Sequence, residues 1–179
     1  MSQDTIKQTL LAAIDNVKQN PTAAKVVFRA STQLGEGMHC TGTVRDFPAM
    51  SIDEPADLGG SDRGPNPVEL VLVALGTCQE IVYRAYASVL GIELESVTCN
   101  LRGYLDLRGL FGMDEAIPAG FQKIIFDTEI RSNASREDLQ KLAQIVEAHC
   151  PVLNTLQTPV EVAGNVVING QAMVLEATA

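Results

Sequence analysis

One continuous apolar stretch constrains the fold of this 179-residue chain more than any other feature. Within residues 68–75 every residue except Glu69 is apolar, so this segment has no polar face to turn toward water. A helix that is apolar on all sides is a buried helix. The charged residues Glu80 and Arg84 interrupt the stretch too early for it to span a bilayer. The sequence therefore predicts a central, buried helix over residues 67–90.

Both ends of this helix carry recognisable signals. Asn66 can serve as the N-cap, and Pro67 suits the first helical position, where its missing N–H is not needed. Gly91 can end the helix because glycine adopts the left-handed conformation without strain. Cys78 lies near the middle of the stretch, and helical spacing places it on an apolar face. The other members of that face are Val71, Ala74, Leu75, Ile81 and Val82.

A glycine inside the helix indicates a close approach. Glycine destabilises a helix interior by up to about 1 kcal/mol relative to alanine, yet Gly76 lies in the middle of the apolar stretch. We therefore expect another helix to approach closely at Gly76.

Composition excludes several classes of function. The net charge of -9 argues against nucleic acid and against an anionic membrane as partner, and aromatic residues, at 4%, are too few for a base-stacking platform. No secretion signal is evident, and the four cysteines contain no Cys-x-x-Cys pair. We expect a cytoplasmic protein with reduced thiols, no metal and no cofactor.

The remaining chain reads as strands and helices that alternate in an α+β order. Helical spacing over residues 2–19 predicts an N-terminal helix that ends at Asn20-Pro21. Ser135 opens a second helix to about His149 with a capping box. We expect strands over residues 25–33, 38–44, 49–53, 92–107 and 121–131, loops over 58–67 and 108–120, and a closing strand or hairpin over 160–175 around Asn169-Gly170.

Two motifs together resemble the OsmC/Ohr family, the osmotically induced and organic hydroperoxide resistance proteins. They are Gly64-Pro-Asn-Pro-Val-Glu-Leu-Val-Leu-Val-Ala-Leu-Gly-Thr-Cys78 and His149-Cys-Pro-Val-Leu-Asn-Thr-Leu156. The resemblance implies an intertwined homodimer in which two long central helices are wrapped by antiparallel sheets, with the active site at the subunit interface. It divides the chain into an N-terminal helical extension, 1–20, and an OsmC-like domain, 24–179.

The family resemblance also implies peroxidase chemistry. By position, Cys78 is similar to the peroxidatic cysteine and Cys150 to the resolving one. The implied role is an antioxidant, peroxiredoxin-like stress response that uses a hydroperoxide substrate and an unidentified dithiol reductant. Such an attacking thiol needs a nearby positive charge to lower its pKa from about 8.5. Arg63 in the loop before the helix, and Arg29 or Arg45 on the first strands, are candidates by position.

One departure from the family pattern opens an alternative. The hydroperoxidases carry a glutamate directly after the helix-opening proline, where this chain has Val68, and its acid is the next residue, Glu69. One residue rotates a helix position by roughly 100°. Glu69 and Arg63 are candidate assisting residues, but Glu69 points in a different direction from the glutamate of the hydroperoxidases. The alternative is a non-catalytic OsmC-like dimer that binds an apolar small molecule at the subunit interface. Cys40 and Cys99, both in expected strands, are interpreted as small core residues.

Overall fold

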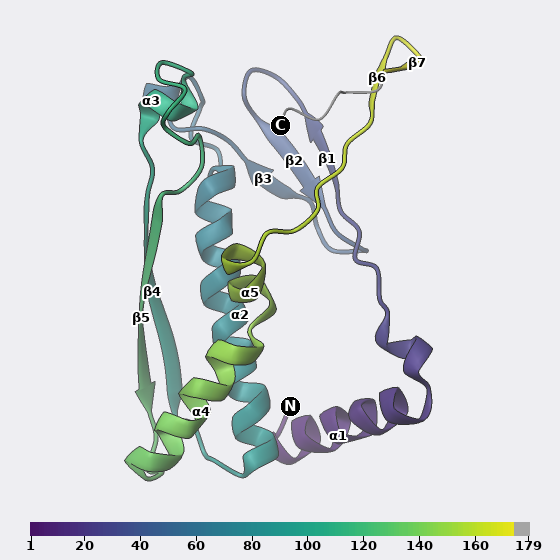
Figure 1. Cartoon of the computed structure of the whole chain (residues 1–179), viewed down its shortest axis with the longest axis vertical. Coiled ribbons are helices and arrows are strands. Elements are labelled where there is room, and N and C mark those ends of the chain that lie inside the picture. Colours follow the sequence, from purple (N-terminus) through teal and green to yellow (C-terminus); the bar gives the residue numbers. More distant parts are fainter. Residues whose placement is uncertain (174–179) are drawn as a thin grey trace.

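The computed structural model describes residues 1–173, and the long helix α2 (Pro67–Leu90) forms its axis (Figure 1). The Asn66 side chain accepts a hydrogen bond from the Glu69 N–H at 2.9 Å, and the Glu69 carboxylate accepts one from the Asn66 N–H at 2.8 Å. Gly91 ends the helix with a φ of 74°. The predicted bounds and caps of this helix are confirmed, because local side chains satisfy the backbone groups that a helix end leaves free.

The described chain forms three separate antiparallel sheets, as the predicted α+β class requires, and the β4–β5 sheet is the one that packs along α2 (Figure 1). Half-buried and exposed residues alternate along all of β4 and, in β5, from Phe126 onward, which is the period of a strand with one face toward a core. The hairpin predicted at Asn169-Gly170 is confirmed, with φ values of 50° and 84°. The strands are β1 (Ser31–Leu34), β2 (Cys40–Thr43) and β3 (Met50–Ile52) in the first sheet, β4 (Ser96–Tyr104) and β5 (Lys123–Arg131) in the second, and β6 (Val166–Ile168) and β7 (Gln171–Met173) in the third.

The core of the chain lies where α2 meets the β4–β5 sheet and the helix α4 (Arg136–His149). Ser135 caps α4 as predicted, since its hydroxyl accepts from the Asp138 N–H at 3.1 Å. A second, smaller cluster lies further toward the N-terminus of α2, beside the short helix α5 (Pro151–Gln157). The buried members of the larger cluster are Tyr83, Ala87, Leu94, Leu142 and Val146, and those of the smaller one are Leu75, Cys150 and Leu153.

Several local expectations are wrong. Strand β1 begins only at Ser31, so residues 25–30 are extended without strand pairing. The expected loop over 108–120 overlaps a short helix, α3 (Leu107–Leu110). Residues 151–157 form another helix, because Pro151 starts a new helix after α4 ends. The N-terminal helix is confirmed as α1 (Gln3–Gln19), followed by one 3₁₀ turn, and a second 3₁₀ turn precedes the loop before α2. Residues 174–175 of the expected closing strand lie outside the described part of the chain.

Gly76 does allow a close approach, but the element that approaches is not the helix we expected. A Cβ atom at Gly76 would lie 2.7 Å from Leu101 Cδ1 and 3.6 Å from Cys99 Cβ. Both neighbours belong to β4, so the glycine admits a strand rather than a second helix. Within residues 1–173, no helix is both long and apolar enough to cross a membrane.

The chain taken alone is far from compact. Its accessible surface is 13558 Å², whereas a compact folded monomer of 19.2 kDa exposes about 8,400 Å². Helix α2 is not buried on every side, since Val73 is 53% exposed and Ile81 is 67% exposed. The excess surface is therefore partly apolar, and it includes the helix whose sequence predicts full burial.

Candidate active site

The fold brings Cys78 and Cys150 into the same apolar cluster, although they are distant in the sequence. Cys78 lies in the middle of α2 and is partly exposed, whereas Cys150 lies between α4 and α5 and is completely buried. Leu75 and Leu153 complete the buried part of this cluster. All four cysteines of the chain are free thiols in this structure. A small reactant from solvent thus has access to Cys78 before it has access to Cys150.

The surroundings of Cys150 keep its thiol protonated at neutral pH. Burial raises the pKa of Cys150, and the adjacent Cys78 thiol raises it further. The backbone N–H groups of Leu153 and Val152 act in the opposite direction without reversing the shift. Both thiols lie in the same apolar cluster. Cys150 is therefore poorly suited to attack a molecule from solvent, because its thiol is both buried and protonated.

An apolar groove opens next to the two cysteines, with a volume of about 520 Å³. It lies between α2, α5 and the start of β5, and it shares Leu75 and Leu153 with the cysteine cluster. Phe121 and Phe126 provide aromatic walls, and Lys123 is the one charged residue of its lining. A groove of this composition suits a ligand with an apolar body.

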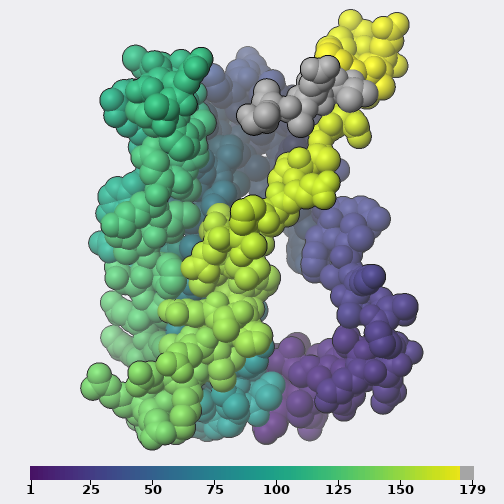
Figure 2. All heavy atoms as spheres, viewed as in Figure 1, coloured from purple at the N-terminus to yellow at the C-terminus, as the bar shows by residue number. Residues whose placement is uncertain are grey.

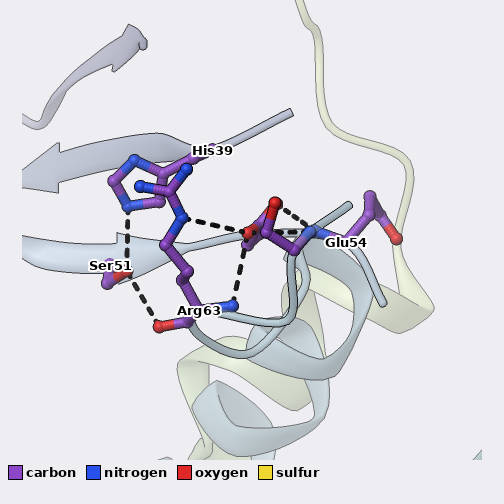
Figure 3. Close-up of polar contacts among 6 residues, drawn as sticks. His39, Ser51, Glu54 and Arg63 are labelled. Atoms are coloured by element: carbon purple, nitrogen blue, oxygen red, sulfur yellow. Dashed lines mark hydrogen bonds and ion pairs between the residues drawn. The ribbon is translucent and has the colours of Figure 1, made fainter. Parts of the chain in front are cut away.

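A buried carboxylate organises the loop that leads into α2 (Figure 3). Asp53 is completely buried, and its oxygens accept hydrogen bonds from the N–H groups of Glu54, Ser61 and Arg63 at 2.9, 3.1 and 3.2 Å. Burial alone raises the pKa of a carboxyl, but these three N–H groups and the Arg63 guanidinium outweigh it and lower the pKa of Asp53. Asp53 is therefore an ionised anchor for residues 54–63.

Ser51 supports the same loop from strand β3. Its hydroxyl donates to the Arg63 carbonyl at 3.0 Å, and His39 Nε2 lies 2.9 Å from the Ser51 hydroxyl oxygen (Figure 3). Because the hydroxyl proton points to the carbonyl, His39 acts as the donor in this pair and not as a base. A Cβ at Gly64 would lie 2.2 Å from the Ser51 carbonyl oxygen, so the loop packs tightly on the strand. This serine–histidine pair is structural.

The charged residues predicted to assist Cys78 lie at the N-terminal end of α2. Glu69 is held in the capping box, and nine residues at 1.5 Å each separate it from Cys78 by about 14 Å along the helix. The Arg63 guanidinium is directed to Asp53, with Nε 3.9 Å from Oδ2. Among residues 1–173, no cationic side chain forms a hydrogen bond with either thiol. The remaining candidates are Arg29, which is exposed in the unpaired segment, and Arg45, which stacks on Phe47 at 4.6 Å.

The structure shows two buried polar residues that no sequence motif indicates, Asp53 and Gln79. Asp53 anchors the loop, and its only sequence signal is the dense run of turn-forming residues that follows it. Gln79 is completely buried next to Cys78, where its Oε1 accepts a 3.5 Å hydrogen bond from Thr128. Its Nε2 has no partner in the described part of the chain.

Comparisons with known proteins agree on one family. The sequence profile of the family described as OsmC-like protein matches residues 59–164. The chain is 28% identical over 117 residues to the uncharacterized protein YmaD of Bacillus subtilis (strain 168), covering 62% of this chain and 73% of that protein. Its fold is similar to that of an OsmC-like protein from Mycoplasma pneumoniae, with a TM-score of 0.65, 21% identity and coverage of 74% and 89% of the two chains. It is also similar to an organic hydroperoxide resistance protein OsmC from Legionella pneumophila, with a TM-score of 0.56, 22% identity and coverage of 74% and 90%.

Proposed function

Because the chain belongs to the OsmC-like protein family, we propose that it is a thiol-dependent peroxidase that reduces organic hydroperoxides through Cys78 and Cys150. The Legionella pneumophila protein, which is named an organic hydroperoxide resistance protein, supports this assignment. In this role the protein removes peroxides in the cytoplasm, where a dithiol reductant returns it to the free-thiol state.

The single observation that carries this proposal is the pairing of an accessible and a buried thiol in one cluster. The Cys78 thiolate attacks one peroxide oxygen, the O–O bond breaks, and the leaving alkoxide takes a proton to become an alcohol. Cys78 is thereby oxidised to a sulfenic acid. The Cys150 sulfur then attacks the Cys78 sulfur, and a disulfide forms with loss of water. A dithiol reductant supplies the two electrons and two protons that restore both thiols.

The groove beside the thiols supports an organic substrate over hydrogen peroxide. Its apolar walls, including Phe121 and Phe126, bury the organic group of a hydroperoxide and leave its O–O end near the cysteine cluster. Hydrogen peroxide has no apolar part to bury and gains nothing from this surface. The proposed enzyme therefore reacts faster with a bulky alkyl hydroperoxide than with hydrogen peroxide.

We also propose that the working form is a homodimer with its site at the subunit interface. The excess accessible surface of about 5,000 Å² per chain is more than the roughly 1,000–2,500 Å² that each subunit of an obligate dimer buries, so it is large enough to supply such an interface. Exposed residues recur along one side of α2 at helical spacing, namely Val73, Thr77 and Ile81. The proposed peroxidase also requires a cation from this second copy at Cys78, because within residues 1–173 of one chain no cationic side chain forms a hydrogen bond with either thiol.

The proposal is tested with three single cysteine variants and an organic hydroperoxide. Cys150→Ser should stop at a sulfenic acid on Cys78 that a dimedone-type reagent traps, and excess peroxide should over-oxidise it. Cys78→Ser should consume no peroxide. Cys99→Ser is the matched control, since its thiol is also partly buried in the core, and it should retain the rate of the native protein. Loss of activity in the control, or its retention in Cys78→Ser, would remove the assignment.

The second candidate function is a non-catalytic dimer that binds an apolar small molecule in the same groove. It is favoured by the absence, within residues 1–173, of a cation hydrogen-bonded to either thiol. A nearby positive charge is what activates the attacking thiol of a peroxidase. The two functions are separated by the reactivity of Cys78 toward peroxide relative to Cys40, which lies in strand β2. Equal reactivity of the two thiols supports the binding protein.

A further inference from the structure

The N-terminal helix α1 lies outside the part of the chain that the family profile matches, and it carries an apolar side that its own chain leaves open. Ile6 and Leu10 are half-buried where α1 contacts α2. Ile14 and Val17 follow at helical spacing on the same side, and they are 45% and 39% exposed. The described chain thus covers the first half of this side and leaves the second half in solvent.

The direction of α1 is fixed by its first turn. Gln3 Nε2 donates to the Ile92 carbonyl at 2.8 Å and to the Ala87 carbonyl at 3.4 Å, so it joins α1 to the C-terminal end of α2. From this attachment α1 extends away from α2, and the chain then returns through residues 21–30 to β1 (Figure 1). A helix held at one end and open at the other is an arm and not a part of the core.

This arm borders an opening in the molecule. Figure 2 shows an unfilled space between the N-terminal segment and the region of α4 and α5. The returning segment exposes Val26, Val27 and Phe28, the last of them at 92%. The opening is therefore bordered by two exposed apolar elements from the same chain. An apolar frame of this kind is stable in water only when something covers it.

We propose that the exposed side of α1 docks on a second copy of this chain, so that the N-terminal arm clasps the dimer. The inference rests on the dimer of the proposed function, and it adds to it a contact from outside the family segment. The second copy is favoured because the excess surface of about 5,000 Å² per chain exceeds the roughly 1,000–2,500 Å² that each subunit of an obligate dimer buries, which leaves surface for a contact by α1 as well. An anionic lipid surface is disfavoured, because α1 carries two lysines and two aspartates and the whole chain has a net charge of -9.

The test uses the full chain and a double variant, Ile14→Ser with Val17→Ser. Since 45% of Ile14 and 39% of Val17 are exposed in the single chain, the substitutions should leave its folding nearly unchanged. The control is Asp15→Ser with Lys18→Ser on the same helix, where the two side chains form an exposed ion pair at 3.6 Å. Sedimentation over a concentration series measures the dimer dissociation constant. For a dimer too tight to dissociate on dilution, the rate of subunit exchange is measured instead.

We expect the double variant to raise the dissociation constant or the exchange rate by about tenfold or more, because two apolar side chains per subunit lose their cover. The control should stay within about twofold of the native protein, since exposed ion pairs contribute little. A native chain that sediments as a monomer would remove the dimer itself, together with the interface part of the proposed function. If the native chain is a dimer but the double variant changes neither the dissociation constant nor the exchange rate, only the proposed contact of α1 with the second copy is wrong.

Discussion

Asp53→Asn is the substitution whose effect follows most directly from the structure. The Asp53 carboxylate accepts three backbone N–H groups while completely buried. Asparagine offers one acceptor oxygen, and its amide group would face donors. A hydrogen bond to a charged group contributes about 1.5–3 kcal/mol, and a buried donor left unpaired costs about 1–3 kcal/mol. If the asparagine oxygen takes the place of Oδ2, it keeps the bonds from Ser61 and Arg63, and its amide group then faces the Glu54 N–H, which is left unpaired. We therefore expect Asp53→Asn to lower the free energy of unfolding by about 3 kcal/mol at pH 7.

The pH dependence of this loss identifies its cause. The native pKa of Asp53 is lowered, so its carboxylate stabilises the fold fully above the unfolded pKa of about 3.9. This stabilisation is lost as the pH falls through the lower native value. Urea unfolding of both proteins should therefore show a constant difference from pH 7 to pH 5 that shrinks below pH 4. Asp62→Asn, in the same loop, is the control. A loss below about 0.5 kcal/mol, or one independent of pH, would refute the anchor role.

Two further predictions concern the faces of α2. Gly76→Leu should lower the free energy of unfolding by about 2 kcal/mol or more, because even a Cβ atom at this position lies 2.7 Å from Leu101 Cδ1. Gly76→Ala should stay within about 1 kcal/mol of the native protein, because its gain in helix propensity offsets the close contact. Urea unfolding of both variants measures the two effects. Ile81→Ser should leave chain folding intact but raise the dimer dissociation constant about 30-fold or more, because the 67% of Ile81 left exposed would lose its cover in both subunits. An unchanged sedimentation profile for Ile81→Ser would contradict the proposed interface.

The elements that could be predicted are those with local signals. The cap and stop of α2 stand beside it in the sequence, and Asn169-Gly170 specifies a tight turn by itself. The strand expected over 25–33 is shorter in the structure, because a strand needs a partner from elsewhere and a pattern of apolar residues does not supply one. Pro151 indicates a helix end as readily as a helix start, which is why α5 was not predicted.

The residues of the candidate site also fall into those that a sequence motif indicates and those that it does not. Cys78 and Cys150 are identified by their motifs, and the structure places them in one cluster. Asp53 has no motif, because its partners are backbone N–H groups that any residue can provide. The full burial predicted for α2 holds only for part of its surface within one chain, since the sequence records apolar character and not which molecule covers it.

The most direct test of the proposed peroxidase is to identify the disulfide that forms when one equivalent of oxidant is added. Reduced native protein is treated with one equivalent of cumene hydroperoxide, and its peptides are mapped by mass spectrometry without reduction. The proposed function predicts the loss of two thiols, one disulfide between Cys78 and Cys150, and unmodified Cys40 and Cys99. Thiols that remain unconsumed, or a disulfide that involves Cys40 or Cys99 instead, would contradict it.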